Sequence, residues 1–432
     1  MRLKVFRSQF LNSYMDVHAL KKRGMMHKLI LLVRTLLFWL VVVFLVAGGL
    51  GCAGKLTRNP LPSEFTNDAV IPGIPDARFW SDEWPKYSLE KFATLTDAEF
   101  YKIYQGVYNQ PHNYLAISGG GANGAFGAGL LAGWTEAGTR PEFTMVTGVS
   151  TGALSAPFAF LGPDYDDVMK EVYTTTATKD IARKRNPLAA AFNESVADTV
   201  PLRKMIEYYI NTEVIEAIAK EHKKGRRLFI GTANLDAGRG VIWNLGAISV
   251  SDYPRKVELI HDILQASSAI PVMFSPVVIP VEVNGKSYDE MHVDGGTGAQ
   301  VFVYPAAVDW KVVIEKLKVQ GTPEVYVIRN SFIEPDYNGV KRSILPIGSR
   351  TINSLIRTQG IGDLYQIYTL CMRDGNSFNL AYIPSDFTEK PSEVFDPVYM
   401  GKLYDLGYKM AKEGYPWHHL PPGFLVKGIS KD

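Results

Sequence analysis

Two short apolar segments each run directly into a turn, and a stretch of small residues follows each turn. The first segment covers residues 114–118, its glycine-rich turn covers 119–124, and the small residues extend over 125–137. The second segment, 143–149, leads into small residues at 151–161. Short apolar runs bounded by glycine predict buried strands, and the small residues predict helices packed closely on a sheet. This alternation predicts an α/β fold with a mostly parallel central sheet.

Similar patterns continue along the chain. We predict further strands at 226–233, 240–244, 276–283, 290–294 and 324–329, and helices at 89–109, 165–173, 201–220, 255–269, 308–317, 350–371 and 395–412. The chain has 46 basic and 44 acidic residues, and a net charge of +2 argues against a nucleic-acid-binding protein. Its two cysteines, Cys52 and Cys371, are too few for a disulfide scaffold or a four-cysteine zinc site.

The N-terminal region has the residue order of a secretory signal. Basic residues precede an unbroken apolar run at 36–47, and small residues follow it up to Cys52. The position of this cysteine resembles the processing site of bacterial lipoproteins, where the cysteine becomes the lipidated first residue. An uncleaved membrane anchor and plain secretion are the alternatives, and all three place the following chain outside the cytoplasm. Residues 53–88, rich in Pro, Asn, Asp and Gly, predict an extended tether.

Residues 148–152 read GVSTG at the junction of the second predicted strand with its helix. In a strand–serine–helix elbow, the serine stands on a sharp, strained turn that exposes its hydroxyl. Gly148 and Gly152 flank Ser150 because larger side chains would crowd such a turn. The helix that follows directs its positive N-terminal end toward the reacting oxygen. The pattern indicates Ser150 as a candidate nucleophile.

The first turn, GGGANG at 119–124, also joins a strand to a helix. Consecutive glycines allow backbone N–H groups to converge on one point, which a negatively charged tetrahedral oxygen requires. The same residues fit the G-x-G-x-x-G pattern of dinucleotide-binding proteins. That pattern also requires an acidic residue at the end of the second strand, where this sequence has Ser150. A purely structural glycine turn is the remaining alternative.

A serine nucleophile needs a base to accept its proton. Asp294 ends a predicted strand and is followed by the glycine pair 295–296, so its carboxylate could reach Ser150 from an adjacent strand end. An aspartate that begins a turn is also common without any catalytic role. His292 is the competing candidate, because it shares a face of the strand with Asp294.

Three motifs thus occur in order along the chain: GGGANG, GVSTG and DGG. A fourth segment lies between the second and the third and reads ASSAIP at 266–271, with Phe274 and Pro276 after it. Together the four segments resemble the patatin-like phospholipase family over residues 114–307. The resemblance implies a three-layer α/β/α fold with a mostly parallel central sheet and a strand–Ser–helix nucleophile elbow.

The resemblance also implies the roles of individual residues. Ser150 would be the nucleophile and Asp294 the base of a Ser–Asp dyad, with no metal or other cofactor. Asn123 stands where the family often has Arg or Lys. The implied oxyanion hole consists of the backbone N–H groups of Gly120, Gly121 and Ala122. The remaining motif residues are Gly119, Gly124, Gly148, Gly152, Gly295 and Gly296.

By this resemblance we expect a serine acyl hydrolase that cleaves the acyl esters of phospholipids or related lipids. A catalytically silent lipid-binding protein on the same fold is the alternative. We expect residues 1–52 to be a signal, lipoprotein or anchor segment and 89–432 to be the catalytic domain, with 308–432 as an extension beyond the motifs. The expected location is the bacterial cell envelope, anchored to the membrane that holds the lipid substrate, with no nucleic-acid partner.

Overall fold

The computed structural model describes residues 31–42, 58–185, 194–335, 337 and 339–424. It divides into two compact units, Met1–Asn59 and Pro60–Asp432. In the first unit, residues 31–42 form a helix with exposed apolar side chains. Among the described residues, no helix has both the length and the apolar character needed to cross a membrane. Cys52 lies outside the described residues.

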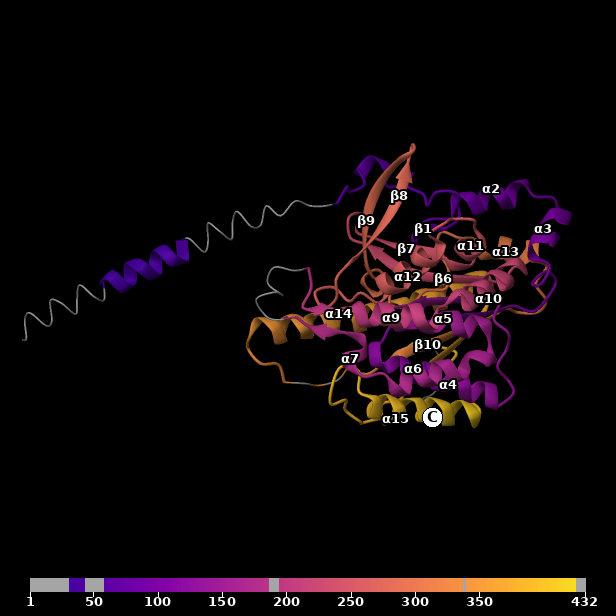
Figure 1. The fold of residues 1–432 in the computed structure, drawn as a ribbon. Coiled ribbons are helices and arrows are strands. Elements are labelled where there is room, and N and C mark those ends of the chain that lie inside the picture. Colours follow the sequence, from indigo (N-terminus) through magenta and orange to yellow (C-terminus); the bar gives the residue numbers. More distant parts are fainter. Residues whose placement is uncertain (1–30, 43–57, 186–193, 336, 338, 425–432) are drawn as a thin grey trace, which may run out of the picture. The chain divides into compact units, whose positions relative to one another are not determined.

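A nine-stranded sheet forms the centre of the second unit (Figure 1). Its parallel strands, in spatial order, are β6 (Arg227–Asn234), β3 (Met145–Val149), β2 (Asn113–Ile117), β10 (Glu324–Phe332) and β11 (Ser377–Ile383). Antiparallel strands complete it: β7 (Arg239–Asn244), β1 (Arg78–Trp80), β8 (Val277–Val283) and β9 (Lys286–Asp294). Short strands β4 (Arg183–Lys184) and β5 (Ala197–Asp198) pair separately.

Strand β6 pairs along one edge with two strands that are distant in the sequence, β3 and β9. On one edge of β6, residues 227–231 pair with β3, whereas 232–234 pair with β9. Strand β7 occupies the other edge over 229–234, so β9 must lie on the same edge as β3 and beyond its end. The register places Asp294 opposite Thr232, one residue past the last residue of β6 that pairs with β3. The end of β9 therefore meets the end of β3.

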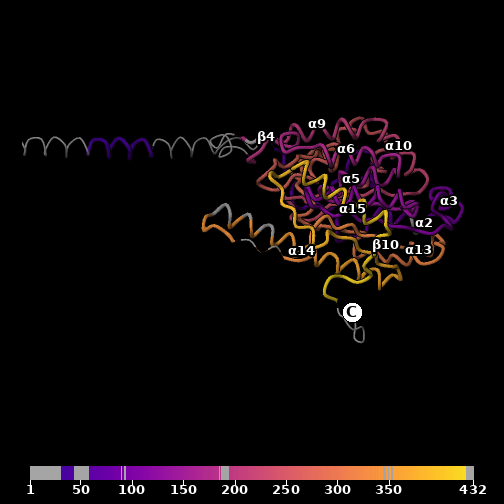
Figure 2. The backbone as a smooth tube through the Cα atoms, turned by 90° about the horizontal axis from the view of Figure 1, so that it is seen from below, coloured from indigo at the N-terminus to yellow at the C-terminus, as the bar shows by residue number. Residues whose placement is uncertain are grey.

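Helices cover both faces of the sheet. Against one face lie α4 (Gly124–Glu136), α5 (Thr151–Leu161), α6 (Asp166–Thr175), α9 (Val200–Tyr209), α10 (Thr212–Lys223), α11 (Leu245–Val250), α12 (Lys256–Ser267) and α15 (Pro397–Lys412). On the other side lie α3 (Asp97–Tyr104), α13 (Trp310–Leu317) and α14 (Ile344–Asp374). Figure 2 shows α5 and α6 together on one side of β10. The short helices α2 (Lys86–Thr94) and α7 (Thr178–Ile181) complete the α-helices described in this unit, which also has short 3-10 helices.

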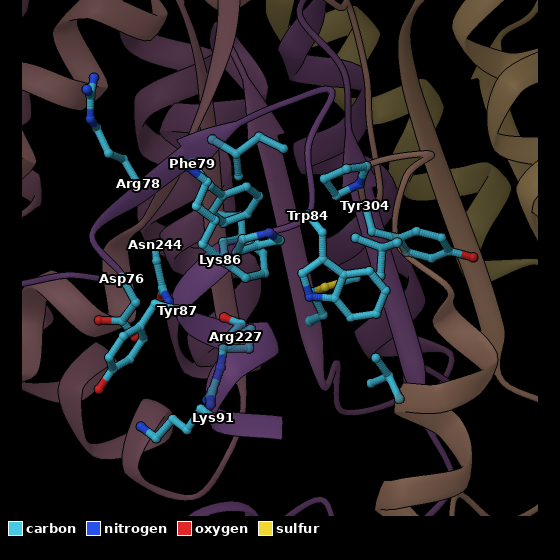
Figure 3. Close-up of a pocket in the computed structure, with 18 of the residues that line it drawn as sticks. Asp76, Arg78, Phe79, Trp84, Lys86, Tyr87, Lys91, Arg227, Asn244 and Tyr304 are labelled. Atoms are coloured by element: carbon cyan, nitrogen blue, oxygen red, sulfur yellow. The ribbon is translucent and has the colours of Figure 1, made fainter. Parts of the chain in front are cut away.

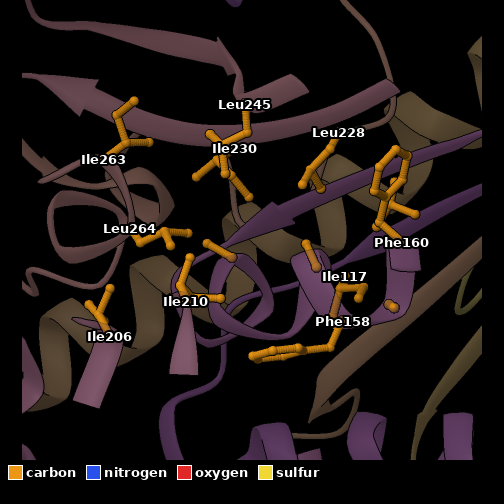
Figure 4. Close-up of a cluster of buried hydrophobic side chains, with 14 of the residues drawn as sticks. Ile117, Phe158, Phe160, Ile206, Ile210, Leu228, Ile230, Leu245, Ile263 and Leu264 are labelled. Atoms are coloured by element: carbon orange, nitrogen blue, oxygen red, sulfur yellow. The ribbon is translucent and has the colours of Figure 1, made fainter. Parts of the chain in front are cut away.

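Alternating side chains of the parallel strands supply the two cores. Leu115, Ile117 and Val146 belong to the larger cluster, which includes the isoleucines and leucines of α9 and α12 (Figure 4). Their neighbours Tyr114 and Met145 belong to the opposite cluster. Since successive strand residues point to opposite faces, both faces are buried and the strands read as continuous apolar runs. The predicted three-layer α/β/α fold with a mostly parallel sheet is confirmed.

Two predicted helices are each divided in the structure. The segment 89–109 forms the separate helices α2 and α3, because Thr96 caps the second: its hydroxyl accepts from the Glu99 N–H, and the Glu99 carboxylate accepts from the Thr96 N–H. The segment 201–220 forms α9 and α10, with Asn211 capping α10 through the Val214 N–H. In the sequence, these polar capping residues look like ordinary surface residues of one long helix. The apolar pattern alone therefore does not show where each helix is divided.

The expected tether over 53–88 is wrong from residue 60 onward. Strand β1 extends the sheet by pairing with β7, and Val70 bridges to Glu282. Arg78, the first residue of β1, forms a buried ion pair with Glu290, in which Nη2 lies 2.9 Å from Oε1. The proline- and glycine-rich composition reflects tight turns in a packed segment, because Ile71, Ile74, Ala77 and Trp80 are all buried.

Candidate active site

The turn between β3 and α5 holds Ser150 in a strained conformation. Its φ of 55° and ψ of −125° lie in a region that L-residues rarely occupy. A Cβ at Gly148 would lie 2.4 Å from the carbonyl oxygen of Gly152, and one at Gly152 would lie 2.2 Å from that of Ile117. Only glycine fits at either position. The GVSTG sequence thus forms the predicted elbow, with a backbone cost of about 1–3 kcal/mol at the serine.

The structure brings Ser150 and Asp294 together at the meeting ends of β3 and β9. Ser150 Oγ donates a hydrogen bond to Asp294 Oδ2 at 2.7 Å. The other carboxylate oxygen, Oδ1, accepts from the Gly296 N–H at 2.8 Å. Both side chains are buried, and this burial raises the pKa of Asp294 to about 6, against the opposing effects of the two hydrogen bonds. The carboxylate is therefore oriented toward the serine and is more basic than an ordinary aspartate.

The glycine turn lies directly beside this pair. A Cβ on Gly119 would be 3.1 Å from Ser150 Cβ, so the backbone of the turn touches the elbow. Within the part of the chain that the structure describes, the N–H groups of Gly120, Gly121 and Ala122 have no hydrogen-bond acceptor. Gly121 has a φ of 56°, which favours glycine. These three donors are free to bind an anionic oxygen close to Ser150.

The ASSAIP segment supports the elbow from behind. Ser267, the last residue of α12, is fully buried, and its Oγ accepts from the Ser150 N–H at 3.0 Å. The same hydroxyl donates to the carbonyl of Gly231 on β6 at 2.7 Å. Ser268 makes a weaker contact with the Ser150 carbonyl, at 3.4 Å. Ser267 thereby joins the nucleophile elbow to β6, the strand that also aligns β9.

Two residues outside the predicted motifs also hold the site together. Asn330, fully buried at β10, accepts from the Gly127 N–H through Oδ1 and donates through Nδ2 to the carbonyl of Ser118. The carbonyl of Gln300 accepts from the Gly119 N–H, and its side-chain amide donates to the Gly296 carbonyl. Sequence analysis missed both. The one available signal was polar Asn330 just after the apolar strand predicted at 324–329, where parallel strands collect functional residues.

His292, the competing base, does not contact Ser150. Its Nε2 lies 3.2 Å from Glu290 and its Nδ1 lies 3.0 Å from the hydroxyl of Thr232. The ring is fully buried against Trp243. Burial lowers the pKa of this histidine more than the neighbouring Glu290 raises it. His292 is therefore enclosed in the core as a packing residue.

Asn123 connects the glycine turn to the C-terminal part of the chain. Its Oδ1 accepts a hydrogen bond from the hydroxyl of Tyr399, on α15, at 2.8 Å. The position thus carries a structural contact in place of a positive charge.

An apolar cavity of about 60 Å³ lies near the elbow, between α5, α6 and α9. Thr151 lines it together with Leu154, Phe158 and Met205.

Part of the chain is similar to a known protein family. Residues 115–307 match the sequence model of the family described as Patatin-like phospholipase. The solved structures that match include one described as the crystal structure of VipD from Legionella pneumophila, at 12% sequence identity and a TM-score of 0.35. That match covers 70% of this chain and 66% of VipD, just under two thirds of its length. No curated protein matches the sequence.

Replacing Ser267 tests how far the elbow depends on its support. Ser267→Ala leaves the buried Ser150 N–H without an acceptor, which typically costs about 1–3 kcal/mol. We expect at least a roughly tenfold slower reaction of Ser150 with a fluorophosphonate, because small displacements of a reacting atom are costly. Ser268→Ala is the matched control and should lose little. An equal loss in both variants would contradict the assigned contact.

Replacing Asp294 should produce a pH-dependent gain in stability. Its folded-state pKa of about 6 exceeds its ordinary 3.8, so the folded protein holds this proton more tightly than the unfolded chain does. The stabilisation of the folded protein by this proton is complete below pH ~4 and is lost as the pH rises through ~6. Asp294→Asn is uncharged at every pH, so we expect it to exceed wild type at pH 8 by on the order of 3 kcal/mol.

Urea denaturation at pH 4 and pH 8 measures this difference. The gain of Asp294→Asn over wild type should be small at the lower pH and large at the higher one. The exposed Asp252→Asn serves as the control. A gain of the same size at both pH values would show that burial does not disfavour the ionised carboxylate.

Proposed function

We propose that this protein is a serine acyl hydrolase that cleaves the acyl esters of phospholipids or related lipids. The observation that carries the proposal is the 2.7 Å hydrogen bond from Ser150 to the buried Asp294, beside three free backbone N–H groups. The lipid class of the substrate is supported by the match to the patatin-like phospholipase family over residues 115–307. No other nucleophile–base pair in the motifs offers the same arrangement among the described residues.

The geometry supports the following acylation step. Asp294 accepts the proton of Ser150 as Oγ attacks the carbonyl carbon of the ester. The carbonyl oxygen becomes an oxyanion, and the N–H groups of Gly120, Gly121 and Ala122 donate to it. When the carbon–oxygen bond of the leaving group breaks, the departing alcohol or lysolipid takes the proton from Asp294. The products are the free alcohol and an acyl group bound to Ser150.

Deacylation repeats these steps with water. Water attacks the acyl carbon and gives a proton to Asp294, and the same N–H groups hold the second oxyanion. Collapse of this intermediate breaks the bond to Ser150 Oγ, which regains the proton. The fatty acid leaves and the enzyme returns to its starting state. Each proton passes through one carboxylate, so no histidine is required.

The raised pKa of Asp294 suits it to this role. An aspartate with its ordinary pKa is a weak base, whereas a value near 6 lies closer to the working pH and improves proton transfer. The Gly296 N–H fixes Oδ1, so Oδ2 stays directed at Ser150. Burial of the carboxylate thus disfavours its ionised form and makes Asp294 a stronger base.

The apolar cavity beside Thr151 supports an acyl substrate. Its lining includes Leu154, Phe158 and Met205, and also Thr151, the residue that follows the nucleophile in the chain. A volume of about 60 Å³ is that of roughly two water molecules, so the cavity holds only a short segment of a chain as it stands. A longer chain requires movement of the surrounding helices α6 and α9.

The test is release of fatty acid from phospholipid vesicles and from a panel of simple acyl esters. We expect wild-type protein to release acid, and Ser150→Ala and Asp294→Asn each to reduce the rate by at least about 10³-fold. Binding of vesicles without release, in wild type as in Ser150→Ala, would instead support the catalytically silent lipid-binding alternative. Circular dichroism of each variant checks that the fold is intact.

We also propose that the N-terminal segment attaches the protein to the bacterial cell envelope through a lipidated Cys52. The support is the order of basic, apolar and small residues before this cysteine. Mass spectrometry of the protein from membranes should then find a lipid-modified Cys52 as the first residue. Recovery of a chain that still begins before residue 52 would favour an uncleaved anchor.

A further inference from the structure

A second cavity lies at the opposite end of the sheet from Ser150. Its volume is about 570 Å³, and Tyr114, Met145 and Arg227, at the starts of β2, β3 and β6, line it. Ser150 follows the last residue of β3, so the five residues of this strand separate the two sites by roughly 15 Å. We call it the strand-start cavity. It shares no lining residue with the Ser150–Asp294 pair or the glycine turn.

Aromatic side chains from several elements line the strand-start cavity. Trp310 stacks on Tyr304 with 4.3 Å between ring centroids, and Phe79 meets Phe229 edge to face at 5.7 Å. Trp84 and Tyr304 border the same space in Figure 3. Protein interiors contain few voids larger than a water molecule, whereas this volume falls within the range of about 300–1,000 Å³ found for ligand pockets. The cavity can therefore hold a ligand with a long apolar part.

Positive charge gathers at one side of the cavity. The guanidinium of Arg227 lies 4.8 Å from the ring centroid of Tyr104, and the ammonium of Lys91 lies 5.3 Å from that of Tyr87. Figure 3 shows Arg227 and Lys91 on the same side, away from Trp84. Burial, together with the nearby charges of Arg227 and Lys91, lowers the pKa of His222 to about 2. This neutral histidine adds no charge of its own to that of the two cations.

Among the described residues, no ion pair joins Arg227 or Lys91 to an acidic residue. Glu83 pairs with Arg239, and Arg78 pairs with Glu290. The charged lining residues that then remain are Lys86, Lys91, Lys223 and Arg227 on the basic side and Asp76 and Glu90 on the acidic side. Within the described residues, the only side-chain hydrogen bonds of Arg227 go to the backbone carbonyls of His222 and Arg226. The cavity thus offers a net positive surface to an anion.

We propose that the strand-start cavity binds a long-chain carboxylate, with its alkyl chain between the aromatic walls and its head group at Arg227 and Lys91. A neutral apolar ligand would leave the two cations without a counter-charge, and a cationic ligand would be repelled. Binding of the carboxylate does not depend on the proposed hydrolysis, because the cavity lies away from Ser150 and the binding is measured on an inactive variant.

Quenching of tryptophan fluorescence by a dibrominated stearate locates the ligand. The titration uses the full chain with Ser150→Ala, held in an amphipathic polymer that keeps the N-terminal segment soluble. Bromine quenches indoles at short range, and Trp80, Trp84 and Trp310 line the cavity, whereas no tryptophan lines the one beside Thr151. We expect saturable quenching, with a large part of its amplitude lost when Trp84→Phe and Trp310→Phe are combined, since only Trp80 then remains at the cavity.

Comparison of stearate with stearyl alcohol tests the head-group contact. We expect stearate to bind at least tenfold more tightly than the alcohol, and shortening the acid by two methylenes to weaken binding roughly tenfold. Arg227→Gln and Lys91→Gln should each weaken stearate binding several-fold and leave binding of the alcohol unchanged. Lys220→Gln, an exposed lysine on α10 outside the cavity, is the matched control.

Three results would overturn the proposal. These are quenching that does not saturate, quenching of equal amplitude in the doubly substituted tryptophan variant, and equal affinity for the acid and the alcohol. Should Arg227→Gln fail to fold, Lys91→Gln on the short helix α2 carries the same test. A wild-type protein that releases no fatty acid from vesicles would contradict the proposed function and leave these binding results unaffected.

Discussion

The position of β9 against β6 decides where the carboxylate of Asp294 lies. Strand β3 pairs with the first part of one edge of β6, and β9 pairs with the next residues of the same edge. The ends of β3 and β9 therefore meet, and the serine and the aspartate come within hydrogen-bond distance. The glycine after the aspartate is required by the same packing, since a Cβ on Gly295 would lie 2.3 Å from the carbonyl oxygen of Gly231. Thus β6 aligns both halves of the site, and Ser267 ties the elbow to it.

This arrangement holds two unfavourable features in place. Ser150 has a strained backbone, and Asp294 is buried where its ionised form is disfavoured. Packing of α5, α9 and α12 on the parallel strands stabilises the fold around them, as the isoleucines and leucines in Figure 4 show. Strain and buried charge at one location, supported by a regular core elsewhere, are typical of functional sites.

The sequence predicted those parts of the fold that have strong local signals. Helix α5 begins and ends where the small residues do, and β2, β3 and β6 lie within one or two residues of their predicted ranges, because buried strands and glycine turns have distinct local patterns. The packed segment at 60–80 was missed, since turns rich in proline resemble a linker. Strand β11 was missed because Ser377 and Asn379 interrupt its apolar run. Gln300 and Asn330 were missed because they act through tertiary contacts without any motif.

The central claim is that Asp294 activates Ser150 as a base with a raised pKa. The most direct measurement is the rate of fluorophosphonate labelling of Ser150 as a function of pH, with the labelled residue mapped by mass spectrometry. The account predicts that labelling rises with pH with a midpoint near 6, as Asp294 loses its proton, and that Asp294→Asn removes this rise. Labelling of Ser150 at the same rate and with the same pH profile in Asp294→Asn would contradict the account.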